Sequence, residues 1–176
     1  HAADRAARLA HETASALTLM HVLPGGALQE LRQWLGTGHA LEQLLHDEAQ
    51  QQLQALAVAL QAQRQVAARL HNTSGAVIDE IGREAEAMDA GLLVLGARGA
   101  GFLRRLVLGS TSERLLRRTT RPLLVVRQTP HEPYRRVLVA LDFSPWSAHA
   151  IALARRVAPH ARLLLFTAYQ VPFEEK

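Results

Sequence analysis

Apolar positions along the chain follow two alternating patterns. Short runs that are apolar on both faces are typical of buried parallel strands, and they occur at 16–23, 65–71, 91–96, 122–127, 136–142 and 161–169. Segments with apolar positions three and four apart predict helices at 2–14, 40–62, 76–88, 111–119 and 145–158. This order predicts an α/β fold, an open doubly wound, Rossmann-like parallel sheet that binds ligands at the carboxyl ends of its strands.

Local signals refine two of these elements. The long helix 40–62 is expected to face the sheet through a stripe of leucines, namely Leu41, Leu44, Leu45, Leu53, Leu56 and Leu60. The polar stretch from Asn72 to Gly75 predicts a turn after the strand at 65–71. His21, in the middle of a strand, is interpreted as a core histidine or one at the edge of a pocket.

The two ends of the chain resemble each other. Residues 6–23 align with residues 150–169, each a helix followed by a strand. The second copy follows a strand that ends at Asp142, whereas residues 1–5, before the first copy, include no such strand. We therefore expect a fragment of a tandem two-domain protein, with domain 1–130 lacking its first strand and segment 131–176 starting a second domain.

The missing strand would occupy the centre of the sheet, and its absence would expose backbone donors and acceptors. Strand 136–142 could fill this position, either within the chain or by exchange between two chains. Exchange is favoured, because helix 145–158 would otherwise compete with helix 2–14 for one position. This hypothesis predicts a homodimer.

Composition narrows the classes of function. The chain has no cysteine, which excludes disulfides, a thiol nucleophile and cysteine-ligated metals. The absence of cysteine fits a reducing, cytoplasmic location. No apolar run approaches the ~20 residues that span a bilayer, so we expect no membrane partner. The formal net charge is +4, and more than half of the arginines lie between Arg98 and Arg136. Such a cluster suits phosphates or an acidic partner, or equally a solvated surface; without aromatic stacking residues it does not indicate nucleic acid.

The sequence gives little support for a metal site or a hydrolase site. The nine histidines include no H-x3-H pair, so no metal site is expected. Ser144, Ser147 and His149 follow Asp142, but no G-x-S-x-G motif accompanies them. Ser144-Pro145 instead predicts the start of a helix.

The stretch "VLGARGAGFLRRLVLGSTSERLL" at 94–116 is rich in glycine. Gly96 ends a strand, Gly99 follows in a loop, and Gly109-Ser110 opens a helix. Glycines allow a ligand to approach the backbone closely, and a helix N-terminus offers free N–H groups. With the hydroxyls of Ser110, Thr111 and Ser112, the stretch predicts a phosphate cradle. The alternative is structural: turn glycines, and a capping box formed by Ser110 and Glu113.

The spacing G-x2-G-x9-G-S resembles the ATP-binding signature of the universal stress protein family, as do "LTLMHVL" and "VLVALDFS" in their contexts. The resemblance implies a five-stranded parallel sheet in the order 3-2-1-4-5 and commonly a dimer. It also implies a stress-response regulator that binds ATP, with at most slow hydrolysis and no catalytic residue. Mg²⁺ would be held mostly by the phosphates and water. A second group in the family lacks the signature and does not bind nucleotide.

Matching positions to the family carries its contacts over to this chain. Leu95 and Val22 would line the adenine pocket, and Asp142 would reach the nucleoside from the second repeat. Arg98 is not one of these family contacts; it lies beside the cradle and could pair with a phosphate or belong to a solvated loop. Ala97 departs from the Ser or Thr frequent in the family. The remaining contacts to phosphate and ribose would come from Gly96, Gly99, Gly109, Ser110 and Ser112. The rival hypothesis is a dimeric scaffold that binds no nucleotide and pairs through strand 122–127.

Overall fold

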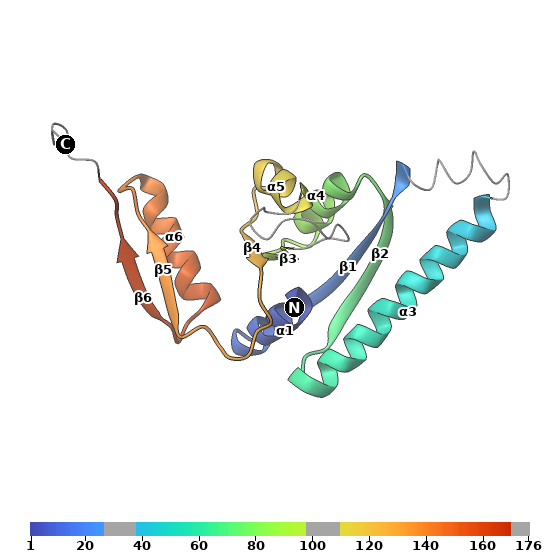
Figure 1. Ribbon diagram of the computed structural model, residues 1–176, viewed down its shortest axis with the longest axis horizontal. Coiled ribbons are helices and arrows are strands. Elements are labelled where there is room, and N and C mark those ends of the chain that lie inside the picture. Colours follow the sequence, from blue (N-terminus) through green and yellow to red (C-terminus); the bar gives the residue numbers. More distant parts are fainter. Residues whose placement is uncertain (27–37, 98–109, 170–176) are drawn as a thin grey trace.

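The structure is a computed structural model that describes residues 1–26, 38–97 and 110–169 (Figure 1). Helices and strands alternate throughout, and every predicted helix and strand has a counterpart. The elements are α1 (Ala2–Glu12), β1 (Leu17–Pro24), α3 (Gly38–Arg64), β2 (Ala68–Gly75), α4 (Val77–Ala87), β3 (Leu93–Gly96), α5 (Ser110–Arg118), β4 (Leu123–Val126), β5 (Arg136–Ala140), α6 (Pro145–Val157) and β6 (Arg162–Phe166).

The described strands form three two-stranded parallel sheets, β1–β2, β3–β4 and β5–β6. The predicted order 3-2-1-4-5 would place β2–β1 and β3–β4 on either side of a central strand. Within the described residues no strand occupies that position, so β1 and β3 each pair along one edge alone. The five-stranded order therefore stays a prediction.

The main core lies where α1 and α3 pack on one face of β1. Small residues of α1 let it approach closely, and leucines of β1 and α3 fill the space between the elements. The buried cluster consists of Ala7, Ala10, Leu17, Leu19, Leu53, Leu60 and Val66. α1 also contacts β3 and β4, so one helix packs against strands of both half-sheets.

The leucine stripe of α3 is only partly buried. Leu53 and Leu60 are in the core, whereas Leu44 is 61% exposed and Leu56 is 38% exposed. The helix has 27 residues, about 40 Å, and β1 and β2 have 8 residues each, about 26 Å. α3 is therefore longer than the strands it covers, and the prediction that Leu44 faces the sheet is wrong, because its side chain is mostly exposed.

The predicted turn at Asn72–Gly75 is also wrong, because these residues form the second half of β2. They pair in parallel register with His21–Pro24 of β1. Pairing with a neighbouring strand overrides the turn preference of their polar side chains. Gln65 has a positive φ of 57° and ends α3, so β2 begins at Ala68 rather than at residue 65.

Residues 136–166 form a separate small layer, in which α6 packs on β5 and β5 pairs with β6 (Figure 1). β5 joins neither β1 nor β3, so filling of the central position within the chain is wrong for the described strands. Exchange between two chains stays a prediction. In the described part of the chain, no helix is long and apolar enough to cross a membrane.

Candidate functional site

The unit β3–α5–β4 carries the largest share of the predicted site residues. Leu95 and Gly96 lie at the carboxyl end of β3, half-buried and paired with Val125 and Val126 of β4. The Ala97 N–H donates to the Val126 carbonyl at 2.9 Å, so pairing continues to the last described residue before the loop. Three predicted contacts, Arg98, Gly99 and Gly109, lie outside the described residues.

α5 is described from Ser110 onward, in the segment where the glycine motif predicts a helix. Thr111 is exposed, whereas Ser112 is only 2% exposed and Leu115, one turn later, is 1% exposed. The first turn therefore directs one hydroxyl-bearing residue outward and one inward. Glu113, the capping partner in the structural alternative, pairs with Arg117 at 3.2 Å.

Val22 is half-buried near the carboxyl end of β1 and lies opposite Thr73 of β2. Its neighbour His21 is exposed, so the core interpretation of that histidine is wrong. The parity of the strand places His21 on the same face as the buried Leu19 and Leu23, yet its own side chain is exposed. A role at the edge of a pocket stays a prediction.

Asp142 lies two residues after β5, beside the start of α6. Its Oδ1 accepts hydrogen bonds from the Ser144 N–H and the Ser147 hydroxyl, both at 2.9 Å. Hydrogen bonds from Ser144, and then from Ser147, lower the pKa of Asp142 to about 2, so the exposed carboxylate is charged at neutral pH. Between them, Phe143 has a positive φ of 59° and an exposed ring.

The geometry around Asp142 is that of a helix start. Ser144 is the N-cap residue and Pro145 occupies the first turn, as predicted. The Ser147 hydroxyl is bonded to Asp142, and Nδ1 of His149 lies 3.3 Å from the Pro145 carbonyl oxygen. The serines and the histidine therefore do not form a nucleophile–base pair here.

The structure thus places the predicted residues in three separate parts of the fold. Leu95, Gly96, Thr111 and Ser112 belong to the β3–α5–β4 unit, Val22 lies on β1, and Asp142 follows β5. Figure 1 shows β5 and α6 away from β1 and β3. Within one chain, Asp142 is not brought to the other site residues.

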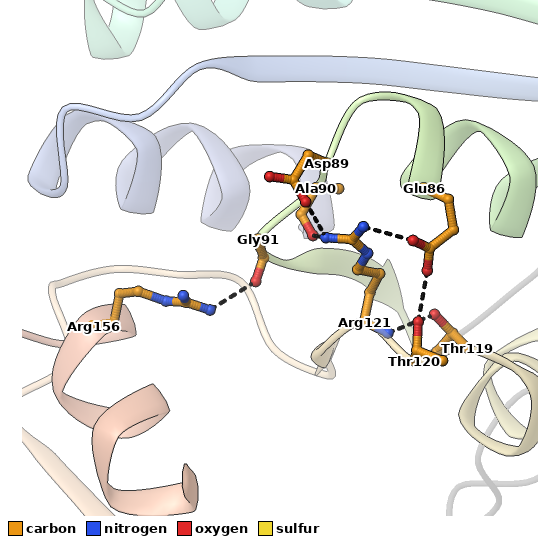
Figure 2. A network of polar contacts seen from close by, with 8 residues as sticks. All are labelled: Glu86, Asp89, Ala90, Gly91, Thr119, Thr120, Arg121 and Arg156. Carbon is orange, nitrogen blue, oxygen red and sulfur yellow. Dashed lines mark hydrogen bonds and ion pairs between the residues drawn. The ribbon is translucent and has the colours of Figure 1, made fainter.

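Sequence reasoning missed a polar network around Arg121 (Figure 2). Nη2 of Arg121 donates to Glu86 at 2.6 Å, and Nη1 donates to Asp89 at 2.5 Å. The Thr120 hydroxyl donates to the other Glu86 oxygen at 2.6 Å. Hydrogen bonds from Arg121, and then from Thr120, lower the pKa of Glu86 to about 2. Hydrogen bonds to Glu86, and then to Asp89, raise the pKa of Arg121.

A cavity of about 330 Å³ lies beside this network, and Arg156 of α6 reaches its rim. Nη2 of Arg156 donates to the Gly91 carbonyl at 3.1 Å. Gly91 and Pro122 precede β3 and β4, so the cavity lies at the amino ends of these strands, opposite Leu95 and Gly96. The lining carries both signs of charge, with two carboxylates held by Arg121, which makes it a poor site for phosphate.

A metal site has no support in the ranges 1–26, 38–97 and 110–169, where no group of three or more His, Asp or Glu side chains could hold an ion. For a nucleotide, the described parts that suit phosphate are the amino terminus of α5 and the exposed Thr111. The half-buried end of β3 offers an apolar wall beside them.

Comparison with known proteins identifies the family. The model described as "Universal stress protein family" matches residues 1–127. Universal stress protein G of Salmonella typhimurium is 32% identical over 111 residues, which are 62% of this chain and 75% of that protein. The chain therefore belongs to the universal stress protein family, which takes part in the stress response.

Solved structures agree on a Rossmann-like α/β fold. A universal stress protein from Archaeoglobus fulgidus superposes with a TM-score of 0.68 at 21% identity, covering 97% of this chain and 63% of that chain. Universal stress protein UspA from Lactobacillus plantarum gives 0.59 at 19% identity, covering 69% and 84%. At these identities the likeness concerns the fold alone.

Proposed function

We propose that this protein binds ATP at the carboxyl end of β3, through the motif G-x2-G-x9-G-S, and acts as a stress-response regulator in the cytoplasm. The observation that carries the proposal is the β3–α5–β4 unit. β3 ends at Leu95-Gly96, and α5 starts at the motif's serine, Ser110. A strand end followed by a loop and a helix N-terminus is the arrangement that holds phosphates in this fold class.

Each part of the unit has a separate task in the proposal. Gly96 lets the ligand approach the backbone at the strand end, and Leu95 packs against the base. The free N–H groups of the first turn of α5 carry partial positive charge toward the phosphates, and the exposed Thr111 hydroxyl adds a donor. From the sequence, Gly99, Gly109, Ser110 and Arg98 complete the cradle, and Val22 completes the base pocket. The Ser112 side chain is buried, so this residue would contribute through its backbone N–H.

Hydrolysis would be slow at most. Efficient phosphoryl transfer needs a group that orients the attacking water and a cation that stabilises the developing charge. The described side chains of β3 and the first turn of α5 include one carboxylate, Glu113, and it is paired with Arg117. Mg²⁺, when bound with ATP, neutralises phosphate charge, and its ligands would be mostly phosphate oxygens and water.

We further propose a homodimer in which segment 136–142 of one copy completes the site of the other. β1 and β3 each leave one edge unpaired in the described structure. Residues 137–139 are apolar in sequence, as in a strand buried on both faces. Insertion would cost the five-residue pairing with β6 and gain pairing along two edges. It would also bring the Asp142 carboxylate to the nucleoside.

The rival function is a dimeric scaffold of the stress response that binds no nucleotide. The observation that favours it is β4, which pairs with β3 along one edge and leaves the other edge unpaired among the described strands. Two copies could join through this edge without a ligand. Nucleotide that co-purifies with the protein separates the two functions, because a scaffold would release none on denaturation.

Thermal unfolding with and without ATP and Mg²⁺ tests the proposed site. Ligand at about 100 times Kd adds ~2.7 kcal/mol to the free energy of unfolding. Gly109→Val should remove the shift by blocking the backbone. Gly91→Val is the matched control, because a Cβ at Gly91 meets no atom within 4 Å and the residue lies outside the motif. No shift of the native protein at millimolar ATP rejects the proposal.

A further inference from the structure

The segment between β4 and β5 is fastened to α1. Arg5 is only 8% exposed, and its Nη1 donates to the Glu132 carbonyl at 3.0 Å. Its guanidinium carbon lies 4.1 Å from the centroid of the Tyr134 ring, the geometry of a cation–π contact. One turn later, Nη2 of Arg8 donates to the His131 carbonyl at 3.3 Å. We call residues 130–134 the strap.

The strap is bound to a helix that is itself anchored. Nε of Arg64, at the end of α3, donates to Asp4 at 2.7 Å, and Ala7 is fully buried in the core. Within the strap, Pro130 is buried. Proline has few conformations to lose on ordering, so a strap with two prolines, Pro130 and Pro133, binds at a low entropic cost.

The position of β5 depends on the strap. β5 starts at Arg136, two residues after Tyr134, so a bound strap fixes where the strand begins. Beyond the strap, α6 contacts the first domain where Arg156 donates to the Gly91 carbonyl. The layer β5–α6–β6 is thus joined to the first domain at two points, the strap and Arg156 (Figure 1).

We propose that the strap is a latch that controls strand exchange between two copies of this chain. This inference rests on the exchanged dimer proposed above. While the strap is bound, β5 stays beside β6 and Asp142 stays away from the nucleotide site. Once it is released, the nine residues 127–135 can extend up to ~30 Å. That reach lets β5 pair with β1 and β3 of a second copy.

The contact between Arg5 and Tyr134 gives the latch a specific test. Tyr134→Ala removes the ring from the strap without changing α1, and Arg5→Ala removes the cation from the other side. Tyr134→Phe keeps the ring and is the matched control. Arg69→Ala deletes an exposed arginine of β2 and controls for charge. Two quantities are measured without nucleotide: the rate of tryptic cleavage in 127–136, and the dimer fraction by light scattering.

The two disrupting variants should be cleaved about tenfold faster than the native protein, the factor that corresponds to ~1.4 kcal/mol, and their dimer fraction should rise. Tyr134→Phe and Arg69→Ala should behave like the native protein. Unchanged cleavage in Tyr134→Ala and Arg5→Ala would overturn the latch. Faster cleavage with no increase in dimer would overturn the exchange that the latch is proposed to control. Because no ATP is present, a failure of nucleotide binding leaves this result unaffected, so the two proposals fail separately.

Discussion

Arg121 and Glu86 lie 35 residues apart in sequence and are joined by a hydrogen-bonded ion pair of 2.6 Å (Figure 2). The pair ties the turn before β4 to the last turn of α4. Arg121 also binds Asp89, whose positive φ of 49° places it in the turn that leads to β3. One side chain therefore fixes the entry points of both strands of the unit that carries the proposed site.

Arg121→Ala should lower the melting temperature by a few degrees, because it leaves Glu86 and Asp89 without their shared cation. Arg117→Ala is the matched control. It removes an exposed arginine whose partner Glu113 lies one turn away on the same helix, and such pairs contribute little. Thermal unfolding at low ionic strength measures both. Equal effects of the two substitutions would contradict the role of Arg121 as a tie between turns.

The lowered pKa of Glu86 makes stability depend on pH in a defined window. The folded-state pKa is about 2, below the ordinary value of 4.5. The stabilisation is therefore fully present above about pH 4.5 and is lost as the pH falls toward 2. Glu86→Gln should have a shallower loss of stability across this window, measured by urea unfolding at a series of pH values. Part of the pH dependence should remain in Glu86→Gln, because the pKa of the Asp142 carboxylate is also lowered to about 2.

Leu115 and Leu116 are neighbours on α5 with opposite surroundings, since Leu115 is 1% exposed and Leu116 is 61% exposed. Leu115→Ala should reduce the free energy of unfolding by about 2–5 kcal/mol, the usual cost of a cavity in a core. Leu116→Ala should change it by no more than about 0.5 kcal/mol. Denaturant unfolding of the two variants compares them. A similar cost for both would show that α5 is not packed as described.

Two glycines near α4 should respond to alanine in opposite directions. A Cβ at Gly82, inside the helix, meets no atom within 4 Å, so Gly82→Ala should stabilise the protein by about 0.5–1 kcal/mol. At Gly75, with φ of +153°, a Cβ would lie 2.9 Å from Cγ of Glu80. Glu80 accepts a hydrogen bond from Thr73 and pairs with Arg83, so it cannot move freely.

Gly75→Ala should therefore destabilise by about 1–3 kcal/mol, the cost of a backbone held in a rare conformation. Chemical denaturation of the two single variants provides the measurement. If Gly75→Ala were as stable as the native protein, the described end of β2 would be wrong.

The patterns of apolar residues were sufficient to predict the helices and strands, because the helical spacing and the short apolar runs can both be recognised in short windows of sequence. They were not sufficient at Asn72–Gly75, where pairing with His21–Pro24 decides the conformation. The exposure of Leu44 likewise depends on which part of α3 is covered by its neighbours. Such features follow from neighbours that are distant in sequence.

The same limit applies to the site. The glycine motif, read with the strand before it and the helix after it, predicted a helix that the structure describes from Ser110 onward. The Arg121 network and the strap could not be predicted from the sequence. Arg121 and Glu86 lie 35 residues apart, Arg5 and Glu132 lie 127 residues apart, and neither pair has the spacing of a known motif. Arg5 in particular reads as an exposed helix residue, yet it is buried under the strap.

A calorimetric titration of ATP with Mg²⁺ into the native protein, repeated with Gly109→Val and with the Gly91→Val control, tests the central claim most directly. The account predicts saturable binding to the native protein and to Gly91→Val, and none to Gly109→Val. No heat of binding to the native protein at millimolar ATP, or equal binding to Gly109→Val, would contradict it.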